Sequence, residues 1–365
     1  YTKDLNAIAI ITKEKSYSYT EFLSLVEIYS QHFKGKNYEK VAMYSENRME
    51  WIAAFYAGWK NSCIVVTIDY MASIDDVSYI LNDCEPGLIF TSNGLKESIE
   101  EIKKKIEYTP DILFLDNTTA KQEVTITEWK EPKDLNDTAV IIYTSGTTGS
   151  PKGVMLSYTN IISNIAGVVD DAKIYTKDRQ VLILLPLHHV FPLVGSMIVP
   201  LHIGATIVMS PSMQSPDLLE TLKNNKVVVM IGVPRLFELL YKGLKAKVEA
   251  KAIGRLFYKI VKASGSKSLA KKVFKKVHVG FGGNLLYMVS GGAALPKHVG
   301  EFFQTLGFDV LEGFGMTEAA PMITFTRPGK IRIGSNNLKG FCMKHFDYIS
   351  IGGGSGGIAS ANRAA

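Results

Sequence analysis

Cysteine is scarce in this sequence, and its spacing excludes several kinds of site. The 365 residues include three cysteines, Cys63, Cys84 and Cys342, which lie far apart and form no C-x-x-C pair. Three isolated thiols indicate neither a zinc site nor a disulfide framework. They are typical of a reducing compartment, so we expect a cytoplasmic protein.

Uncharged stretches long enough to cross a membrane are also rare. Residues 181–201 contain no Lys, Arg, Asp or Glu and reach the length of about 20 residues that a spanning helix needs. Pro186, Pro192 and Pro200 would break a single helix repeatedly. We therefore predict a buried strand, a turn and a buried helix in this segment.

Acidic residues are almost absent from one segment. Residues 242–276 hold twelve Lys or Arg and a single acid, Glu249, with apolar residues interleaved. This pattern favours a pair of surface helices with solvated basic faces. The alternative is a basic amphipathic surface in peripheral contact with anionic lipid, at the inner face of the membrane. No recognition motif accompanies the charge, so we expect no nucleic acid partner.

Most of the chain alternates between helix-like and strand-like segments. Helical spacing at 19–33 and 49–62 alternates with β-rich runs at 40–47 and 63–69, and the same succession recurs further on. This alternation predicts an α/β fold of stacked, mostly parallel sheets with helices on both faces. Because it stops near residue 340, we expect one large domain over 1–340 and a separate fragment over 341–365.

The most informative stretch is a loop rich in glycine and hydroxyl residues. Residues 139–156 read AVIIYTSGTTGSPKGVML, a β-rich run followed by that loop. Its glycines can turn backbone N–H groups toward an anion, and Lys152 adds a positive charge. Pro151 and Gly153 stand where a Walker A loop requires glycine and a hydroxyl, so this is a different phosphate-binding pattern. The alternative is a flexible turn.

The loop resembles the signature of the acyl-adenylate-forming superfamily, which includes acyl-CoA synthetases and luciferases. Three further stretches match in the same order: LPLHHVF at 185–191, VSGGAALP at 289–296 and LEGFGMTE at 311–318. The similarity covers roughly residues 1–335 and looks closest to long-chain fatty acid–CoA ligases. It implies the large N-terminal domain of that family without its C-terminal lid domain. The reaction implied is activation of a fatty acid by ATP as acyl-AMP, followed by thioester formation with CoA.

The resemblance also implies roles for single residues. His189 would lie near the substrate carboxylate, Lys152 and Thr317 would contact phosphates, and Glu318 would hold Mg²⁺ with help from the Thr144 hydroxyl. These four, Lys152, Thr317, Glu318 and His189, are the implied catalytic residues. The implied phosphate-binding residues are Thr144, Ser145, Gly146, Thr147, Thr148, Gly149 and Lys152. The implied adenine-binding residues are Gly291, Gly292, Ala293, Phe314 and Gly315, with Phe314 in place of the family's usual tyrosine.

The end of the sequence departs from this family. The ribose-binding aspartate, the hinge residue and the lid lysine of the family have no counterpart after Glu318. Residues 343–365 instead resemble the start of glutathione reductase, with a G-x-G-x-x-G at 352–357. That pattern stops before the acidic residue, about 20 positions on, that would bind a ribose. We therefore expect this tail not to set the function.

The missing lid has an expected consequence for activity. A closing lid contributes more to the reaction than one phosphate contact does, so we expect weak binding of Mg·ATP and poor turnover. Three alternatives stay open. The acceptor could be an acyl carrier protein, the tail could belong to an FAD-dependent glutathione-disulfide reductase, or the chain could be a non-catalytic membrane-surface fragment.

Overall fold

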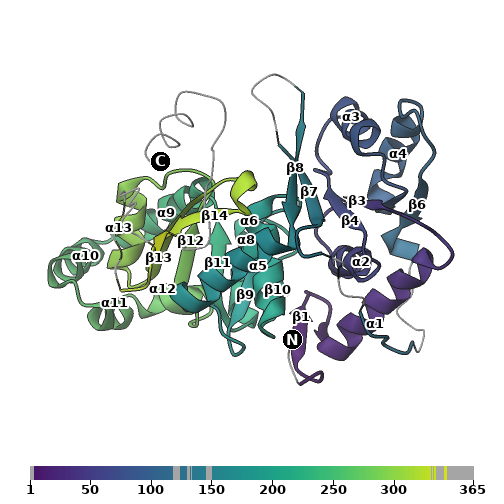
Figure 1. Ribbon diagram of the computed structural model, residues 1–365. Coiled ribbons are helices and arrows are strands. Elements are labelled where there is room, and N and C mark those ends of the chain that lie inside the picture. Colours follow the sequence, from purple (N-terminus) through teal and green to yellow (C-terminus); the bar gives the residue numbers. More distant parts are fainter. Residues whose placement is uncertain are drawn as a thin grey trace, which may run out of the picture.

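Two β-sheets with helices on both faces make up the fold (Figure 1). The computed structural model describes residues 4–117, 124–129, 132, 134–144, 150–329, 331, 333 and 341–342. The predictions for residues 145–149 and for the tail at 343–365 lie outside the described residues.

The smaller sheet has the strand order β6-β5-β3-β4-β7-β8. Its first five strands are parallel, and β8 pairs with β7 in antiparallel fashion. The strands are β3 (Lys40–Tyr44), β4 (Ile64–Thr67), β5 (Leu88–Thr91), β6 (Asp111–Phe114), β7 (Thr138–Thr144) and β8 (Lys152–Ser157). Val41 and Met43 of β3 join one apolar core while Ala42 and Tyr44 join another, so helices cover both faces.

The helices of this sheet alternate with its strands along the chain. They are α1 (Tyr19–Ser30), α2 (Met49–Lys60), α3 (Ile74–Cys84) and α4 (Lys96–Lys103). The start of α1 is fixed by a capping box, in which the Ser18 hydroxyl accepts from the Glu21 N–H at 3.1 Å and the Glu21 carboxylate accepts from the Ser18 N–H at 2.8 Å. In α3, the hydroxyl of Ser73 accepts from the N–H of Asp76. The predicted alternation of helices and parallel strands is confirmed here.

The larger sheet has the order β15-β14-β13-β12-β11-β9-β10-β1-β2. Strands β13 to β1 in this order are parallel, and the edge strands β2, β14 and β15 are antiparallel. The strands are β1 (Ile8–Ile11), β2 (Ser16–Ser18), β9 (Gln180–Ile183), β10 (Thr206–Met209), β11 (Val227–Gly232), β12 (Tyr287–Ser290), β13 (Asp309–Gly315), β14 (Met322–Phe325) and β15 (Phe341–Cys342).

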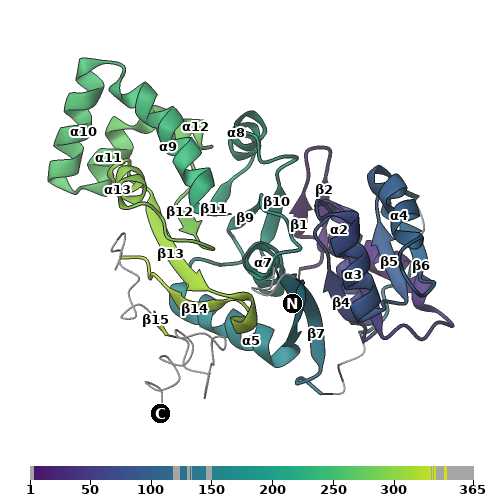
Figure 2. The same ribbon diagram turned by 90° about the horizontal axis from the view of Figure 1, so that it is seen from above.

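Helices also cover both faces of the larger sheet (Figure 2). They are α5 (Tyr158–Gly167), α6 (Val190–Pro192), α7 (Val199–His202), α8 (Ser215–Asn224), α9 (Pro234–Glu249), α10 (Ala252–Ser264), α11 (Lys267–Val273), α12 (Lys275–Gly280) and α13 (Lys297–Thr305). Shorter turns are η1 (Gln31–Phe33), η2 (Asn93–Leu95), η3 (Leu115–Asn117) and η6 (Thr317–Ala319), and the wider helical turns are η4 (Val168–Ala172) and η5 (Leu193–Ile198).

The uncharged segment 181–201 folds as predicted, into the buried strand β9, a turn and the buried helical run that ends with α7. Across the residues that the structure describes, no helix is both long and apolar enough to span a bilayer. The basic segment 242–276 differs from the expected pair of helices, because it contains the end of α9, all of α10 and α11, and the start of α12. The extra break occurs at Gly265, whose φ of +63° ends α10 in the left-handed region that glycine favours.

Candidate functional site

A cavity of about 240 Å³ opens at the carboxyl ends of β12 and β13, facing the start of α6. This edge of a parallel sheet is where open α/β folds usually bind ligands. The lining residues are Val190, Phe191, Gly291, Gly292, Gly313, Phe314, Gly315, Met316, Thr317, Pro321 and Met322. The cavity thus brings together most of the predicted adenine-binding set and Thr317. Ala293 is exposed just beyond Gly292 and does not line it.

Two glycines allow the cavity walls to approach each other closely. A Cβ atom on Gly291 would lie 2.8 Å from the ring of Phe191, and one on Gly315 would lie 2.0 Å from the carbonyl oxygen of Pro321. Neither position has room for a side chain. The ring of Phe314, in contrast, is 55% exposed and forms an aromatic wall of the cavity. A planar heterocycle could stack on this ring.

The turn that carries Glu318 is held from beneath by α5. Glu318 is exposed and Thr317 is half-buried in η6. Asn164 of α5 is fully buried, and its side-chain N–H₂ donates to the carbonyl oxygens of Ala319, at 3.0 Å, and of Met322, at 3.3 Å. These bonds fix both ends of the turn that positions Glu318. Figures 1 and 2 both show α5 beneath β14 and this turn.

The predicted phosphate loop begins and ends on the β7–β8 hairpin. Thr144 lies directly opposite Lys152 in the antiparallel register, so the pair closes the base of the loop. Lys152 is exposed, Thr144 is half-buried, and β8 contacts η6. The hairpin and the Glu318 turn are therefore neighbours. The other predicted loop residues, Ser145, Gly146, Thr147, Thr148 and Gly149, lie outside the described residues.

The donor set near this junction suits a hard cation. The carboxylate of Glu318 and the hydroxyl of Thr144 are oxygen donors of the kind that Mg²⁺ prefers. Within the described ranges, no three His, Cys, Asp or Glu side chains are placed to hold a metal ion. A magnesium ion here would therefore take most of its ligands from substrate phosphates and water, which is its usual arrangement beside one carboxylate.

The two adjacent histidines lie beside the cavity and do not line it. His188 is 5% exposed and His189 is exposed at the start of α6, with their ring centroids 4.2 Å apart. Burial lowers the pKa of His188 to about 4; the neighbouring His189 adds to this shift and Asp69 opposes it. The ring of His189 is desolvated by its surroundings although the residue reaches the surface, and this desolvation also lowers its pKa. The ring of His188 is therefore neutral at pH 7.

The segment that carries these histidines is anchored to the smaller sheet. Asn47, after β3, donates to the carbonyl oxygen of Leu185 at 2.8 Å and accepts from the N–H of Leu187 at 2.8 Å. The hydroxyl of Thr67, at the end of β4, donates to the carbonyl oxygen of His188 at 3.0 Å. Sequence reasoning missed Asn47, Thr67 and Asn164. A polar side chain at the exit of a strand, or within the apolar run of a helix, is the signal that could have identified them.

A second, apolar cavity of about 10 Å³ lies behind Phe191 and shares Phe191, Pro321 and Met322 with the first. Its other lining residues are Asn164, Val168, Tyr175, Val194, Gly195, Val199 and Val289. None of the described residues that line either cavity carries a positive charge. Of these residues, Phe191 is the one aromatic residue that lines both spaces.

Comparisons with known proteins agree with this arrangement. Long chain acyl-CoA synthetase 8 of Arabidopsis thaliana is 26% identical over 335 residues, which cover 79% of this chain and 46% of that protein. The mitochondrial malonate–CoA ligase ACSF3 of Homo sapiens is 27% identical over 80% of this chain and 49% of that protein. The chain spans about half the length of these curated relatives.

Solved structures show the same fold. The crystal structure of ATP-bound MatB from Rhodopseudomonas palustris superposes with a TM-score of 0.72 at 22% identity, covering 91% of this chain and 61% of that one. The predicted N-terminal α/β fold is thereby confirmed. A family model described as AMP-binding enzyme matches residues 2–342. The chain therefore belongs to the AMP-binding enzyme family, whose acyl-adenylate-forming CoA ligases are its relatives.

Proposed function

We propose that this chain activates a long-chain fatty acid with ATP as an acyl-adenylate, as the first step of thioester formation with CoA. The observation that carries the proposal is that two separate motifs line one cavity and a third lies against the turn beside it. The turn after β12 supplies Gly291, the end of β13 supplies Phe314 and η6 supplies Thr317. The β7–β8 hairpin with Lys152 lies against η6. Each motif alone is a weak signal for nucleotide binding, and their convergence is a strong one.

The proposed roles follow from the chemistry of each group. Phe314 would stack on adenine while Gly291 and Gly315 let the backbone approach it. Lys152 would neutralise the pyrophosphate leaving group, and Thr317 would donate to the α-phosphate. A magnesium ion bound by Glu318 and Thr144 would offset phosphate charge when present. The ring N–H of His189 would donate a hydrogen bond to the substrate carboxylate.

The long-chain substrate is the finer part of the proposal. One curated relative is named for long-chain acyl groups and another for malonate. Malonate would bring a second carboxylate into the site, and a buried carboxylate needs a cationic partner that the described cavity linings lack. The apolar space behind Phe191 favours a hydrocarbon chain instead. Since that space is only about 10 Å³, room for about one water molecule, Phe191 and other lining side chains have to move for a chain to enter.

Binding measurements on this chain test the nucleotide site. We expect Mg·ATP to bind by isothermal titration calorimetry, and Lys152→Ala to weaken it by roughly 10- to 100-fold, the value of one charged contact. Lys103→Ala, which removes an exposed lysine of α4 far from the cavity, is the matched control. No binding of ATP by the unaltered chain, or equal binding by both variants, would contradict the proposed site.

Stable acyl-adenylate analogues test the substrate class. We expect a palmitoyl analogue to bind more tightly than a malonyl analogue. Phe191→Ala should tighten the binding of the palmitoyl analogue alone, because it removes the aromatic ring that lines both cavities. Tighter binding of the malonyl analogue would contradict a long-chain substrate and favour a short dicarboxylate instead. The acceptor is tested by comparing thioester formation from free CoA and from acyl carrier protein in a chain extended to the relatives' length. The domain division at residue 340 remains part of the proposal.

A further inference from the structure

Helix α10 presents an unpartnered apolar stripe to solvent. Ile253, Leu256, Phe257 and Ile260 are 58%, 55%, 42% and 47% exposed. Their spacing of i, i+3, i+4 and i+7 places them along one side of the helix. The side that packs on the protein is a different one, where Val261 is 2% exposed and Tyr258 stacks on Phe302 with a centroid distance of 5.6 Å.

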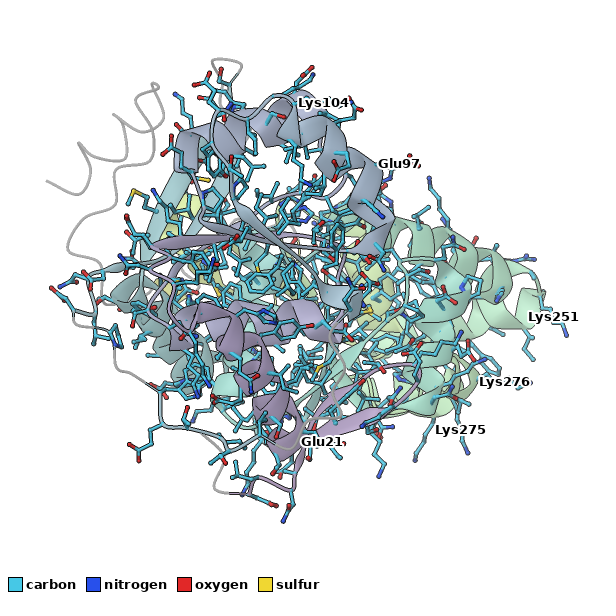
Figure 3. The ribbon with its side chains drawn as sticks, turned by 90° about the vertical axis from the view of Figure 1, so that its right-hand side faces the viewer. Glu21, Glu97, Lys104, Lys251, Lys275 and Lys276 are labelled. Carbon is cyan, nitrogen blue, oxygen red and sulfur yellow. The ribbon has the colours of Figure 1, made fainter. Side chains whose placement is uncertain are left out.

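This stripe lies in the most basic region of the chain. Residues 242–276 hold twelve Lys or Arg and one acid. Within the described part of the chain, only Lys262 and Lys267 of these cations form ion pairs, with Glu301 and Asp309. Lys259 follows Leu256 by three positions and therefore lies beside the stripe. Figure 3 shows Lys251, Lys275 and Lys276 along the rim of the same lobe, and Figures 1 and 2 both place α10 at its outermost edge.

We propose that α10 docks this protein on an anionic lipid bilayer, with Ile253, Leu256, Phe257 and Ile260 inserted among the acyl chains. The surrounding lysines would contact the lipid phosphates. Large apolar side chains on one side of a helix, with lysines around them, are the features of a helix that lies in the plane of a membrane interface. The lobe matches an anionic bilayer in two ways: its cations suit the lipid phosphates, and its apolar side chains suit the acyl chains.

A bilayer explains the stripe better than other anionic partners do. A nucleic acid would engage the lysines and leave four large apolar side chains in water. The proposal does not depend on nucleotide binding, because α10 contributes no residue to the cavity beside β12 and β13.

Vesicle co-sedimentation of the whole chain tests the docking surface. We expect binding to phosphatidylcholine vesicles that contain phosphatidylglycerol, weak binding to phosphatidylcholine alone, and a marked loss when salt is raised from about 0.1 M to about 1 M. Lys251→Gln with Lys259→Gln should weaken binding roughly 25-fold, since each lysine near an anionic surface contributes about fivefold. Lys103→Gln with Lys104→Gln makes the same change in net charge at the C-terminal end of α4, at the other end of the molecule, and should have little effect (Figure 1).

The apolar stripe has its own variant and control. Leu256→Ser with Phe257→Ser should reduce vesicle binding at least as much as the charge variant. Leu135→Ser with Met213→Ser, at residues 50% and 52% exposed elsewhere, should leave it unchanged. Equal binding by the stripe variant and the unaltered chain would overturn the proposal. A second result would also overturn it: an unaltered chain that does not bind vesicles and that sediments as a dimer, while the stripe variant sediments as a monomer. The stripe would then be covered by a second copy of the chain.

Discussion

At the scale of single residues, Asn164 connects a buried helix to the turn that carries Glu318. Its two donated bonds, at 3.0 and 3.3 Å, end on the carbonyl oxygens of Ala319 and Met322. We expect Asn164→Leu, which preserves volume but removes both donors, to lower the free energy of unfolding by about 2 kcal/mol and to weaken Mg·ATP binding. Urea unfolding and calorimetry measure the two effects. Asn61→Leu, which removes one bond on the surface of α2, is the control and should leave ATP affinity unchanged. If Asn164→Leu binds ATP normally, the turn does not need this support.

The buried ring of His188 makes stability depend on pH. Its pKa lies at about 4 in the folded chain, below the ordinary value of 6.5, so below pH 6.5 the unfolded chain binds the additional proton. Stability therefore falls as the pH is lowered from about 6.5 to about 4 and stops falling through this group below that range. The loss is on the order of 3 kcal/mol. We expect His188→Phe to remove this component, as measured by urea unfolding at several pH values. Parallel pH profiles of the two proteins would show that another group is responsible.

At the scale of elements, Asn47 connects the smaller sheet to the segment before α6. It exchanges two hydrogen bonds with the backbone of Leu185 and Leu187, so it acts as an additional strand neighbour for that segment. We expect Asn47→Ala to cost about 2 kcal/mol of unfolding free energy, because both bonds are lost at once. The same variant should raise hydrogen exchange at residues 185–189 more than at β9. Uniform exchange across both stretches would show that the segment is held by packing alone.

Sequence reasoning predicted the elements better than their connections. Strand β7 and the turns after β12 and β13 could be predicted because β-rich runs end directly in glycine motifs. The register that pairs Thr144 with Lys152 could not, since the residue pattern does not fix the point at which the loop closes into a hairpin. Ala293 was placed at the adenine site by the resemblance of its motif, but it is exposed and is not among the described residues that line the cavity. The contact between Asn164 and Ala319 joins positions 155 residues apart, which no local pattern reports.

At the scale of the whole molecule, one apolar core joins the two sheets. Val41 and Met43 from β3 belong to the same buried cluster as Val181 and Ile183 from β9. The hydroxyl of Tyr19 in α1 also donates to the carbonyl oxygen of Ala205 at 2.7 Å, in a buried position before β10. A continuous core of this kind favours unfolding in a single cooperative step.

A ligand that binds at the junction of both sheets should therefore stabilise both together. We expect Mg·ATP at about 100 times its dissociation constant to add about 2.7 kcal/mol and to raise the melting temperature by a few degrees. Of the three tryptophans, Trp51 and Trp59 lie in α2 and Trp129 contacts Tyr56 of the same helix, with ring centroids 6.0 Å apart. Tryptophan fluorescence therefore reports on the smaller sheet, while circular dichroism reports on all the helices and strands. Both midpoints should rise by the same amount, and Lys152→Ala should reduce both shifts. If the midpoint measured by dichroism rose and the midpoint measured by fluorescence did not, the two sheets would unfold separately. The hairpin of the smaller sheet would then not take part in binding the nucleotide.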